Sequence, residues 1–379
     1  MVKNEKTKRE EYNNIYKSAK GNWDKYIIFI ELGLNLLNPN GVISFIVKNT
    51  LISSKYSETI RRMMLNYNIR EIRDYSTVEV FKNADVYPVI FRMNKQKEKD
   101  NYVAVNVMKT LNDYKVQNKI ESVEFYKNIF LDFYFFENKY SKIILKLLKK
   151  NNFESNDICK IISACTVNES YKMKEIILDK KNMDIDDFKF INSGTIDPYK
   201  TLWGKKKTQY IKKQYLYPSI NINKLKKISN ERANITNAEK LIIANMTKGL
   251  ECFYDKKSNY CAGKSTTIIL KGKKNYSLKF ICAILNSKLI NFFVLIYFNS
   301  LKMSGGAINF GQEQIKKLPF PLDLNNLNKI SEIVEKILKK INLDTNADIS
   351  EEKKIIDHLV YQCFGLNPDE VKLVENFEV

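Results

Sequence analysis

The sequence has 379 residues, 44% hydrophobic and 28% charged, which is the composition of a globular protein long enough for two or three domains. Its six cysteines form no Cys-x-x-Cys pair and His358 is the only histidine, which argues against a zinc site, against any other metal centre and against histidine-based catalysis. The most apolar window, 281–301, is interrupted by polar residues. It predicts a buried helix rather than a membrane span, and we expect a cytoplasmic protein.

The net charge of +20 is concentrated in one segment. Lys and Arg minus Asp and Glu give 18 − 12 = +6 for residues 1–100 and 15 − 14 = +1 for residues 101–199. The same count gives 23 − 5 = +18 for residues 200–320 and 7 − 12 = −5 for residues 321–379. An excess confined to one globular segment predicts a polyanionic partner, with nucleic acid favoured over a membrane.

The first hundred residues predict alternating helices and strands. The apolar patterns indicate two helices, at residues 24–37 and about 55–65, and three strands, at 42–47, 69–75 and 86–93. The first strand is a short apolar run typical of buried parallel strands, and the other two form a hairpin around a turn at 83–85. This order corresponds to half of a doubly wound α/β sheet. It is too small to be a complete domain, because three strands cannot cover both faces.

The rest of the chain predicts a second domain and a tail. Residues 101–157 form a connecting segment with a strand at 103–107 and a helix at 139–150. Residues 158–322 alternate short strands and helices, among them 241–244, 266–270 and one long helix at 278–298, with a loop at 304–306. Two amphipathic helices, 325–341 and 349–362, make up the acidic tail of residues 323–379.

The segment from Gly194 to Lys213 is the main candidate for binding nucleic acid. It interleaves aromatic residues with lysines: Tyr199, Trp203 and Tyr210 with Lys200, Lys205, Lys206, Lys207, Lys212 and Lys213. Lysines neutralise phosphates and aromatic faces stack on bases. A solvated lysine face over aromatics that belong to a local core fits the same pattern equally well.

Two further lysines lie in predicted loops, Lys248 and Lys264, and each is either a phosphate contact or an ordinary surface lysine. Gly263-Lys264-Ser265 is not a nucleotide-binding loop, because that pattern needs a glycine where Ser258 stands.

Short motifs along the chain resemble, in the right order, those of the adenine-specific (N6) DNA methyltransferases of the gamma class. These enzymes are often fused to a nuclease in type IIG restriction–modification proteins. In the first hundred residues these motifs are Asp24–Glu31, Leu37–Leu51, Arg61-Arg62, Ile72–Tyr75 and Val80–Phe91. Later in the chain they are Gly194–Tyr199, Trp203–Lys207, Ala262–Thr266, Leu285–Leu289, Leu318–Pro321 and Leu359–Glu370.

The resemblance implies a fold and a reaction. Residues 1–100 would be the second half of a Rossmann-like class I methyltransferase sheet and 101–157 a connection. Residues 158–322 would be a mixed α/β target-recognition domain that binds double-stranded DNA through Tyr199, Trp203 and the lysines, and 323–379 a helical tail. The reaction would move a methyl group from S-adenosylmethionine to adenine N6. By the same resemblance Phe81 would pack against the flipped base, a core phenylalanine being the alternative.

Two motifs of that family are missing from this sequence. One is the Gly-rich loop that binds S-adenosylmethionine, and the other is Asn-Pro-Pro-Tyr. We therefore expect the cofactor to be bound mainly by an upstream half on a separate chain, and this chain to be inactive alone. The sequence leaves two alternatives open. One is a non-catalytic DNA specificity subunit, and the other is an inactive remnant of a type IIG enzyme.

Overall fold

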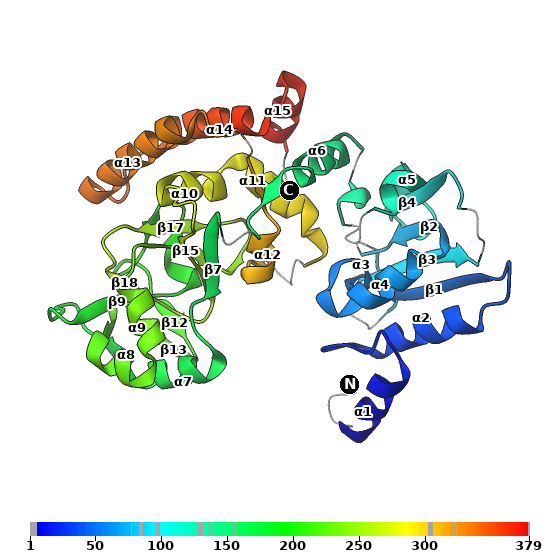
Figure 1. Ribbon diagram of the computed structural model, residues 1–379, viewed down its shortest axis with the longest axis horizontal. Helices are drawn as coiled ribbons and strands as arrows, with labels where there is room; N and C mark the ends of the chain where they lie inside the picture. The colour runs from blue at the N-terminus through cyan, green and yellow to red at the C-terminus, as the bar shows by residue number, and fades with distance from the viewer. Residues whose placement is uncertain are drawn as a thin grey trace. The chain divides into compact units, whose positions relative to one another are not determined.

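The structure is a computed structural model that describes residues 6–76, 78–82, 86–95, 99–127, 132–136, 138–154, 157–301, 306–321 and 323–377. The turn expected at 83–85 and most of the loop expected at 304–306 lie outside these ranges. The chain divides into two compact units. Unit 1 comprises residues 1–144 and 296–301, and unit 2 comprises residues 145–295 and 302–379 (Figure 1).

Unit 1 is built on a five-stranded sheet with the order β1-β3-β2-β4-β5. Only β2 and β4 pair in parallel among these neighbours. The strands are β1 (Val42–Lys48), β2 (Asn68–Asp74), β3 (Pro88–Asn94), β4 (Tyr102–Met108) and β5 (Tyr114–Glu121). The β2–β3 hairpin forms as predicted. The domain boundary expected at residue 100 falls inside this sheet, because β4 and β5 extend it.

The helices of unit 1 are short, and α2 lies directly on β1 (Figure 1). A Cβ on Gly33 of α2 would come within 2.6 Å of the Ile43 Cδ1 atom, so the two elements approach closely only because this residue is glycine. The helices are α1 (Lys6–Ile15), α2 (Lys25–Leu36), α3 (Thr50–Ser53), η2 (Lys55–Ser57), α4 (Glu58–Met64), α5 (Ser122–Phe125), η3 (Asp132–Phe135), α6 (Asn138–Leu148) and η5 (Asn299–Leu301).

The prediction that residues 42–47 form a buried parallel strand is wrong. β1 pairs antiparallel with β3, and its burial alternates: Ile43 and Val47 are buried beneath the helices, whereas Val42 and Ile46 are 56% and 44% exposed. The opposite face of the sheet carries polar groups, such as the ion pair of Arg73 with Glu71 at 2.6 Å. An apolar run does not distinguish a strand covered on both faces from one covered on a single face.

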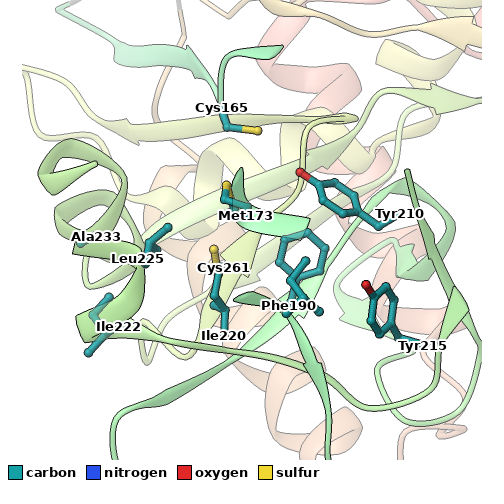
Figure 2. Packing of buried hydrophobic residues seen from close by; sticks show 11 residues of the cluster. Cys165, Met173, Phe190, Tyr210, Tyr215, Ile220, Ile222, Leu225, Ala233 and Cys261 are labelled. Carbon is teal, nitrogen blue, oxygen red and sulfur yellow. The ribbon is translucent and has the colours of Figure 1, made fainter. Parts of the chain in front are cut away.

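Unit 2 contains two four-stranded sheets, with the orders β18-β9-β14-β8 and β17-β15-β19-β7. Their strands are β7 (Cys159–Ser163), β8 (Leu178–Asp179), β9 (Asp187–Ile191), β14 (Pro218–Asn221), β15 (Lys240–Ala244), β17 (Cys252–Asp255), β18 (Tyr260–Ala262) and β19 (Thr266–Lys271). One core cluster fills the space between the first sheet and the helices α7 (Val167–Ile176), α8 (Ile222–Ile228) and α9 (Asn230–Thr236), as Figure 2 shows.

The long helix predicted at 278–298 is two helices, α10 (Leu278–Asn286) and α11 (Lys288–Tyr297), bent by 57° at Ser287. The break is stabilised because the Asp357 carboxylate accepts a hydrogen bond from the Lys288 backbone N–H at 2.8 Å, which satisfies a free donor at the start of α11. No single helix of the described residues is long and apolar enough to cross a membrane. The bent pair passes that test of length and composition together.

The remaining helices of unit 2 are α12 (Gln312–Lys316), α13 (Leu327–Leu343), α14 (Ser350–Phe364) and α15 (Pro368–Glu375). Short elements complete the unit: β6 (Asn151–Asn152), η4 (Ser193–Thr195), β10 (Ile196–Asp197), β11 (Lys200–Thr201), β12 (Thr208–Tyr210), β13 (Lys213–Tyr215), β16 (Met246–Thr247), β20 (Ile308–Asn309) and β21 (Pro319–Phe320). α13 packs on α10 and α14, so the acidic tail is part of unit 2.

Candidate nucleic-acid interface

Seven predicted lysines of unit 2 are exposed. Within the part of the chain that the structure describes, none of them forms an ion pair with a carboxylate: Lys205, Lys206, Lys207, Lys212, Lys213, Lys248 and Lys264. Other lysines of the same unit are neutralised, for instance Lys256 by Glu335 at 2.9 Å and Lys288 by Glu375 at 2.6 Å. The predicted lysines therefore keep positive charge that no carboxylate of the described residues offsets through an ion pair, as do other exposed lysines of unit 2 such as Lys226 and Lys227.

The hairpin β12–β13 presents Lys212 and Lys213 at a tight turn. Tyr210 pairs with Lys213, which leaves the two turn residues Ile211 and Lys212 with φ of 42° and 65°. Positive φ at both central residues is the geometry of a type I′ hairpin, and it is unusual for a β-branched residue. The turn thus reverses the chain within two residues. The Lys213 Nζ lies 4.9 Å from the centre of the ring of the buried Tyr215.

Asn192 links this hairpin to the loop that carries Lys264. Its side-chain Nδ2 donates to the Gln209 carbonyl at 3.2 Å, and its Oδ1 accepts from the Ser265 backbone N–H at 3.1 Å. A Cβ at Gly263 would lie 2.8 Å from that same Oδ1, so glycine is required by this close approach. The glycine of the Gly263-Lys264-Ser265 motif is thus explained by the packing of this loop.

The loop that carries Lys248 is anchored at both ends. The Asn245 N–H donates to the Ser265 carbonyl at 3.1 Å, which places this loop beside that of Lys264. At the other end, the Leu250 N–H donates to the Asn291 side chain on α11 at 2.7 Å. Three loops with exposed lysines are therefore joined through shared hydrogen bonds.

The two tyrosines of the segment are not available for stacking. Tyr199 and Tyr210 are 1% and 2% exposed, and burial raises the pKa of each hydroxyl. Trp203 is half-buried: its Nε1 donates to the Pro218 carbonyl at 2.7 Å, and the Lys189 Nζ lies 4.8 Å from its ring. The expectation that Tyr199 meets bases is therefore wrong, because its ring is buried in the core, whereas a contact of the partly exposed Trp203 with DNA stays a prediction.

Lys205 and Lys200 also contact the turn between α13 and α14. The Lys200 Nζ donates to the Thr345 carbonyl at 3.2 Å, and the Lys205 Nζ donates to the Thr345 hydroxyl. Both lysines bind neutral oxygens there, so these contacts do not offset their positive charge.

A carboxyl group lies among these lysines. Burial and the neighbouring Asp197 raise the pKa of Glu251 to about 7, against the opposing effect of Lys206. Glu251 is therefore partly protonated at neutral pH.

Phe81 is 44% exposed, in the connection between β2 and β3 of unit 1. The alternative of a core phenylalanine is excluded, because the ring keeps a large solvent-facing area. His358 is exposed on α14 and its Nε2 lies 3.0 Å from the Gln362 side-chain nitrogen, a surface position. In the described residues no group of three His, Cys, Asp or Glu side chains is arranged to hold a metal ion.

One exposed helix was missed from the sequence. α7 begins at Val167 and exposes Asn168, Tyr171 and Lys172, and the Tyr210 hydroxyl donates to its Ser170 carbonyl at 3.2 Å. A signal for this helix was present, because Thr166 and Glu169 form the Thr-x-x-Glu pattern of a capping box.

Two family models match the chain. Residues 1–81 match the Eco57I restriction–modification methylase, and residues 189–320 match the TaqI-like C-terminal specificity domain. The second range contains all seven exposed lysines.

Curated relatives align with nearly the whole chain. The type II methyltransferase M.BstVI of Geobacillus stearothermophilus is 22% identical, over 97% of this chain and 71% of its own length. The type II restriction enzyme and methyltransferase RM.Eco57I of Escherichia coli is also 22% identical, over 96% of this chain and 45% of its own length, so this chain spans less than half of it.

Among solved structures, the type IIL restriction–modification enzyme MmeI in complex with DNA superposes with a TM-score of 0.49 and 10% identity. The match covers 93% of this chain and 50% of MmeI. The type IIG restriction endonuclease BpuSI gives a TM-score of 0.37, again with 10% identity, 93% of this chain and 50% of its own.

The sequence resemblance is confirmed at the level of these domains. Residues 1–81 are part of a restriction–modification methylase domain, and residues 189–320 are a TaqI-like specificity domain.

Proposed function

Starting from these two domains of the restriction–modification methyltransferases, we propose that the chain is the DNA-recognition part of an adenine-specific DNA methyltransferase. In the completed enzyme, a methyl group moves from S-adenosylmethionine to adenine N6 in a specific duplex sequence. The chain supplies sequence recognition and one wall of the catalytic pocket, and an upstream half on a separate chain supplies most of the cofactor site.

The observation that carries the DNA-binding part is the set of seven exposed lysines without ion pairs on the specificity domain. Each Lys–phosphate contact releases counterions from duplex DNA, and this release supplies sequence-independent affinity. Glu251 lies near Lys206, which lowers its pKa, but burial keeps that pKa raised and so reduces the negative charge of the carboxyl near neutral pH.

Phe81 is the pocket residue that we propose on the methylase side. A base turned out of the duplex needs a flat apolar surface to replace the stacking that it loses. An aromatic ring that is 44% exposed provides such a surface, whereas a core phenylalanine could not.

The sheet edge of unit 1 supports the proposed upstream half. β3 is the sole strand paired with β1 among the described residues, so the other edge of β1 keeps unpaired backbone groups. Exposed apolar side chains flank that edge: Phe29, Leu32 and Leu36 on α2, and Val42 and Ile46 on β1. An unpaired strand beside an apolar patch is a template for adding further strands.

The test is a methyl-transfer assay on duplex DNA with labelled S-adenosylmethionine, with this chain alone and with the product of the preceding reading frame added. The proposal predicts label in DNA only from the mixture. Label in DNA from this chain alone would contradict the proposal that most of the cofactor site lies on another chain.

DNA binding in the same samples separates the remaining outcomes. Binding without transfer in either sample would favour a non-catalytic specificity subunit. Absence of both activities would leave an inactive remnant and contradict the proposal.

A further inference from the structure

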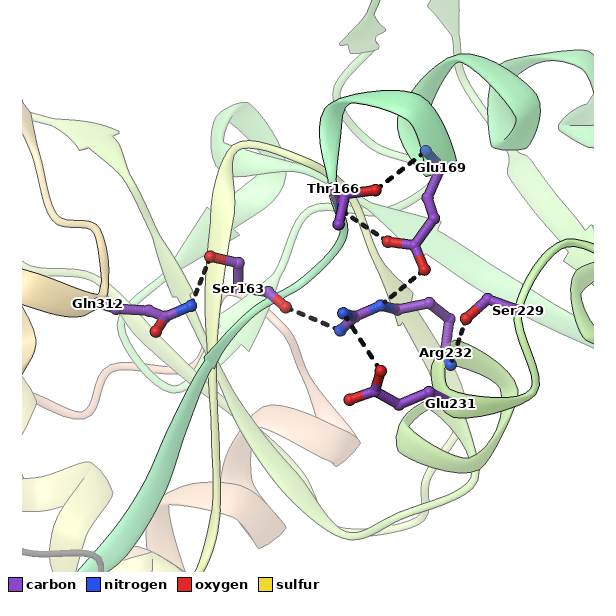
Figure 3. A network of polar contacts seen from close by, with 7 residues as sticks. All are labelled: Ser163, Thr166, Glu169, Ser229, Glu231, Arg232 and Gln312. Atoms are coloured by element: carbon purple, nitrogen blue, oxygen red, sulfur yellow. Dashed lines mark hydrogen bonds and ion pairs between the residues drawn. The ribbon is translucent and has the colours of Figure 1, made fainter. Parts of the chain in front are cut away.

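The N-terminal end of α7 is held by several independent polar contacts (Figure 3). The Thr166 hydroxyl accepts from the Glu169 N–H at 3.2 Å, and the Glu169 carboxylate accepts from the Thr166 N–H at 2.7 Å, which closes a capping box. Arg232 of α9 adds an ion pair to Glu169 at 3.3 Å and donates to the Ser163 carbonyl at 2.9 Å. The start of the helix is therefore tied to both the preceding strand and a neighbouring helix.

The other side of α7 is fixed by the core and by the lysine-bearing hairpin (Figure 2). Met173 is buried in the cluster that contains Phe190 and Tyr210. The Tyr210 hydroxyl donates to the Ser170 carbonyl, and the backbone N–H of Lys264 interacts with the same hydroxyl. One buried tyrosine thus joins α7, the hairpin with Lys212 and Lys213, and the loop of Lys264.

In contrast to this anchoring, the outward side of α7 is free of core contacts. Val167 and Tyr171 are 58% and 56% exposed, and Asn168 and Lys172 are also exposed. Asn168, Tyr171 and Lys172 are spaced i, i+3 and i+4, which puts them on one stripe of the helix. A rigid backbone that presents an amide, an aromatic ring and a cation to solvent is preorganised for specific contacts.

We propose that α7 reads base edges of duplex DNA through Asn168, Tyr171 and Lys172, while the lysines of the adjoining hairpin and loop bind the flanking phosphates. The inference rests on the proposed DNA binding and adds the residues that determine specificity. An α-helix fits the major groove, where Asn can pair with adenine, Lys with guanine, and an apolar group with the thymine methyl.

Charge favours this occupant over a protein partner. On α7, Lys172 and Glu175 are exposed and Lys174 is half-buried, while Glu169 is paired with Arg232. The hairpin joined to α7 through Tyr210 adds Lys212 and Lys213, and the neighbouring loop adds Lys264. The lysines of α7 and of the elements joined to it outnumber the carboxylates of α7, which suits a partner that carries phosphates around its base edges.

The experiment starts with a preferred sequence, obtained by selecting duplexes from a randomised pool with the whole chain. The affinities of N168A/Y171A for that duplex and for a scrambled duplex are then measured by fluorescence anisotropy. We expect the variant to lose roughly tenfold or more in affinity for the preferred duplex and little for the scrambled one, because base contacts carry the sequence preference. An unchanged urea midpoint establishes that the variant is folded.

The matched control is N328A/I355A, which removes an exposed amide and an exposed apolar side chain from α13 and α14, and it should leave both affinities unchanged. If N168A/Y171A keeps the wild-type preference ratio, α7 does not read bases and the inference is wrong, although DNA binding stands. If the wild-type chain binds without any preference, the inference also fails. If it binds no duplex at all, the proposed function fails with it.

Discussion

At the scale of single residues, neighbours in the basic segment have opposite environments. Tyr199 is in the core, whereas Lys205 and Lys206 are on the surface and form no ion pair within the described residues. Glu251 lies among these lysines with a pKa of about 7. Its protonation therefore changes the local charge within the physiological range of pH, and this leads to a pH-dependent prediction.

We expect the chain to bind duplex DNA a few-fold more tightly at pH 6 than at pH 8, and E251Q to lose most of that dependence. Protonation of Glu251 removes a negative charge beside Lys206, and glutamine imitates the protonated form. The measurement is a DNA titration at constant ionic strength across this range. An equally steep dependence in E251Q would assign the pH effect to another group.

The same pKa has a consequence for stability. Because the folded-state pKa is raised from 4.5 to about 7, the stability contribution of this carboxyl is fully present below pH 4.5 and is lost as the pH rises through 7. At pH 8 the free energy of unfolding of E251Q should therefore exceed that of the wild type by about 1 kcal/mol, after allowance for the partial exposure of the group. The two values should converge near pH 5. Urea unfolding at both pH values checks this.

At the scale of elements, the hairpin β12–β13 concentrates charge on a turn whose backbone has little freedom. The Ile211 and Lys212 dihedrals are in the left-handed region, and the hairpin base is fixed by Asn192 and Tyr210. A rigid element with two exposed lysines should contribute two phosphate contacts.

K212A/K213A should reduce the slope of log affinity against log salt concentration by about 1.8, since each phosphate contact on duplex DNA contributes about 0.9. The matched control is K256A/K288A, which removes the same charge from lysines that are paired with Glu335 and Glu375. The hairpin would have no special role if both variants changed the salt slope equally.

At the scale of the whole molecule, the two compact units carry different halves of the proposed task. Unit 1 contains the range matched by the methylase model and a sheet with an open edge, and unit 2 contains the specificity domain with the positive charge. In this proposal the upstream half joins at the edge of the sheet in unit 1. Substitutions there should affect assembly without affecting DNA binding by unit 2.

We expect V42K/I46K to lower methyl transfer by the mixture of the two halves at least tenfold and to leave DNA binding by this chain unchanged. Charges on an exposed edge strand disfavour the addition of another strand. L111K, at an exposed apolar position between β4 and β5, is the control and should be neutral. Full activity of the edge variant would show that the halves do not join along β1.

The sequence by itself determined the elements with strong periodicity and the location of the charge. The helix of residues 25–36, the hairpin of β2 and β3, and the excess of 200–320 follow from local patterns, because apolar spacing and ionisation are properties of the chain. The candidate lysines were found in the same way, since an exposed lysine is the ordinary state of that residue.

Only the tertiary structure decided which of these side chains are accessible. Lys240 belongs to the positively charged range 200–320 but is fully buried and paired with Asp255 at 2.6 Å. Tyr199 is buried, and the Trp203 Nε1 donates to the Pro218 carbonyl. The single-sided cover of β1 and the exposed stripe of α7 likewise depend on which elements pack against them. Burial is set by contacts between residues far apart in sequence, and no local pattern contains that information.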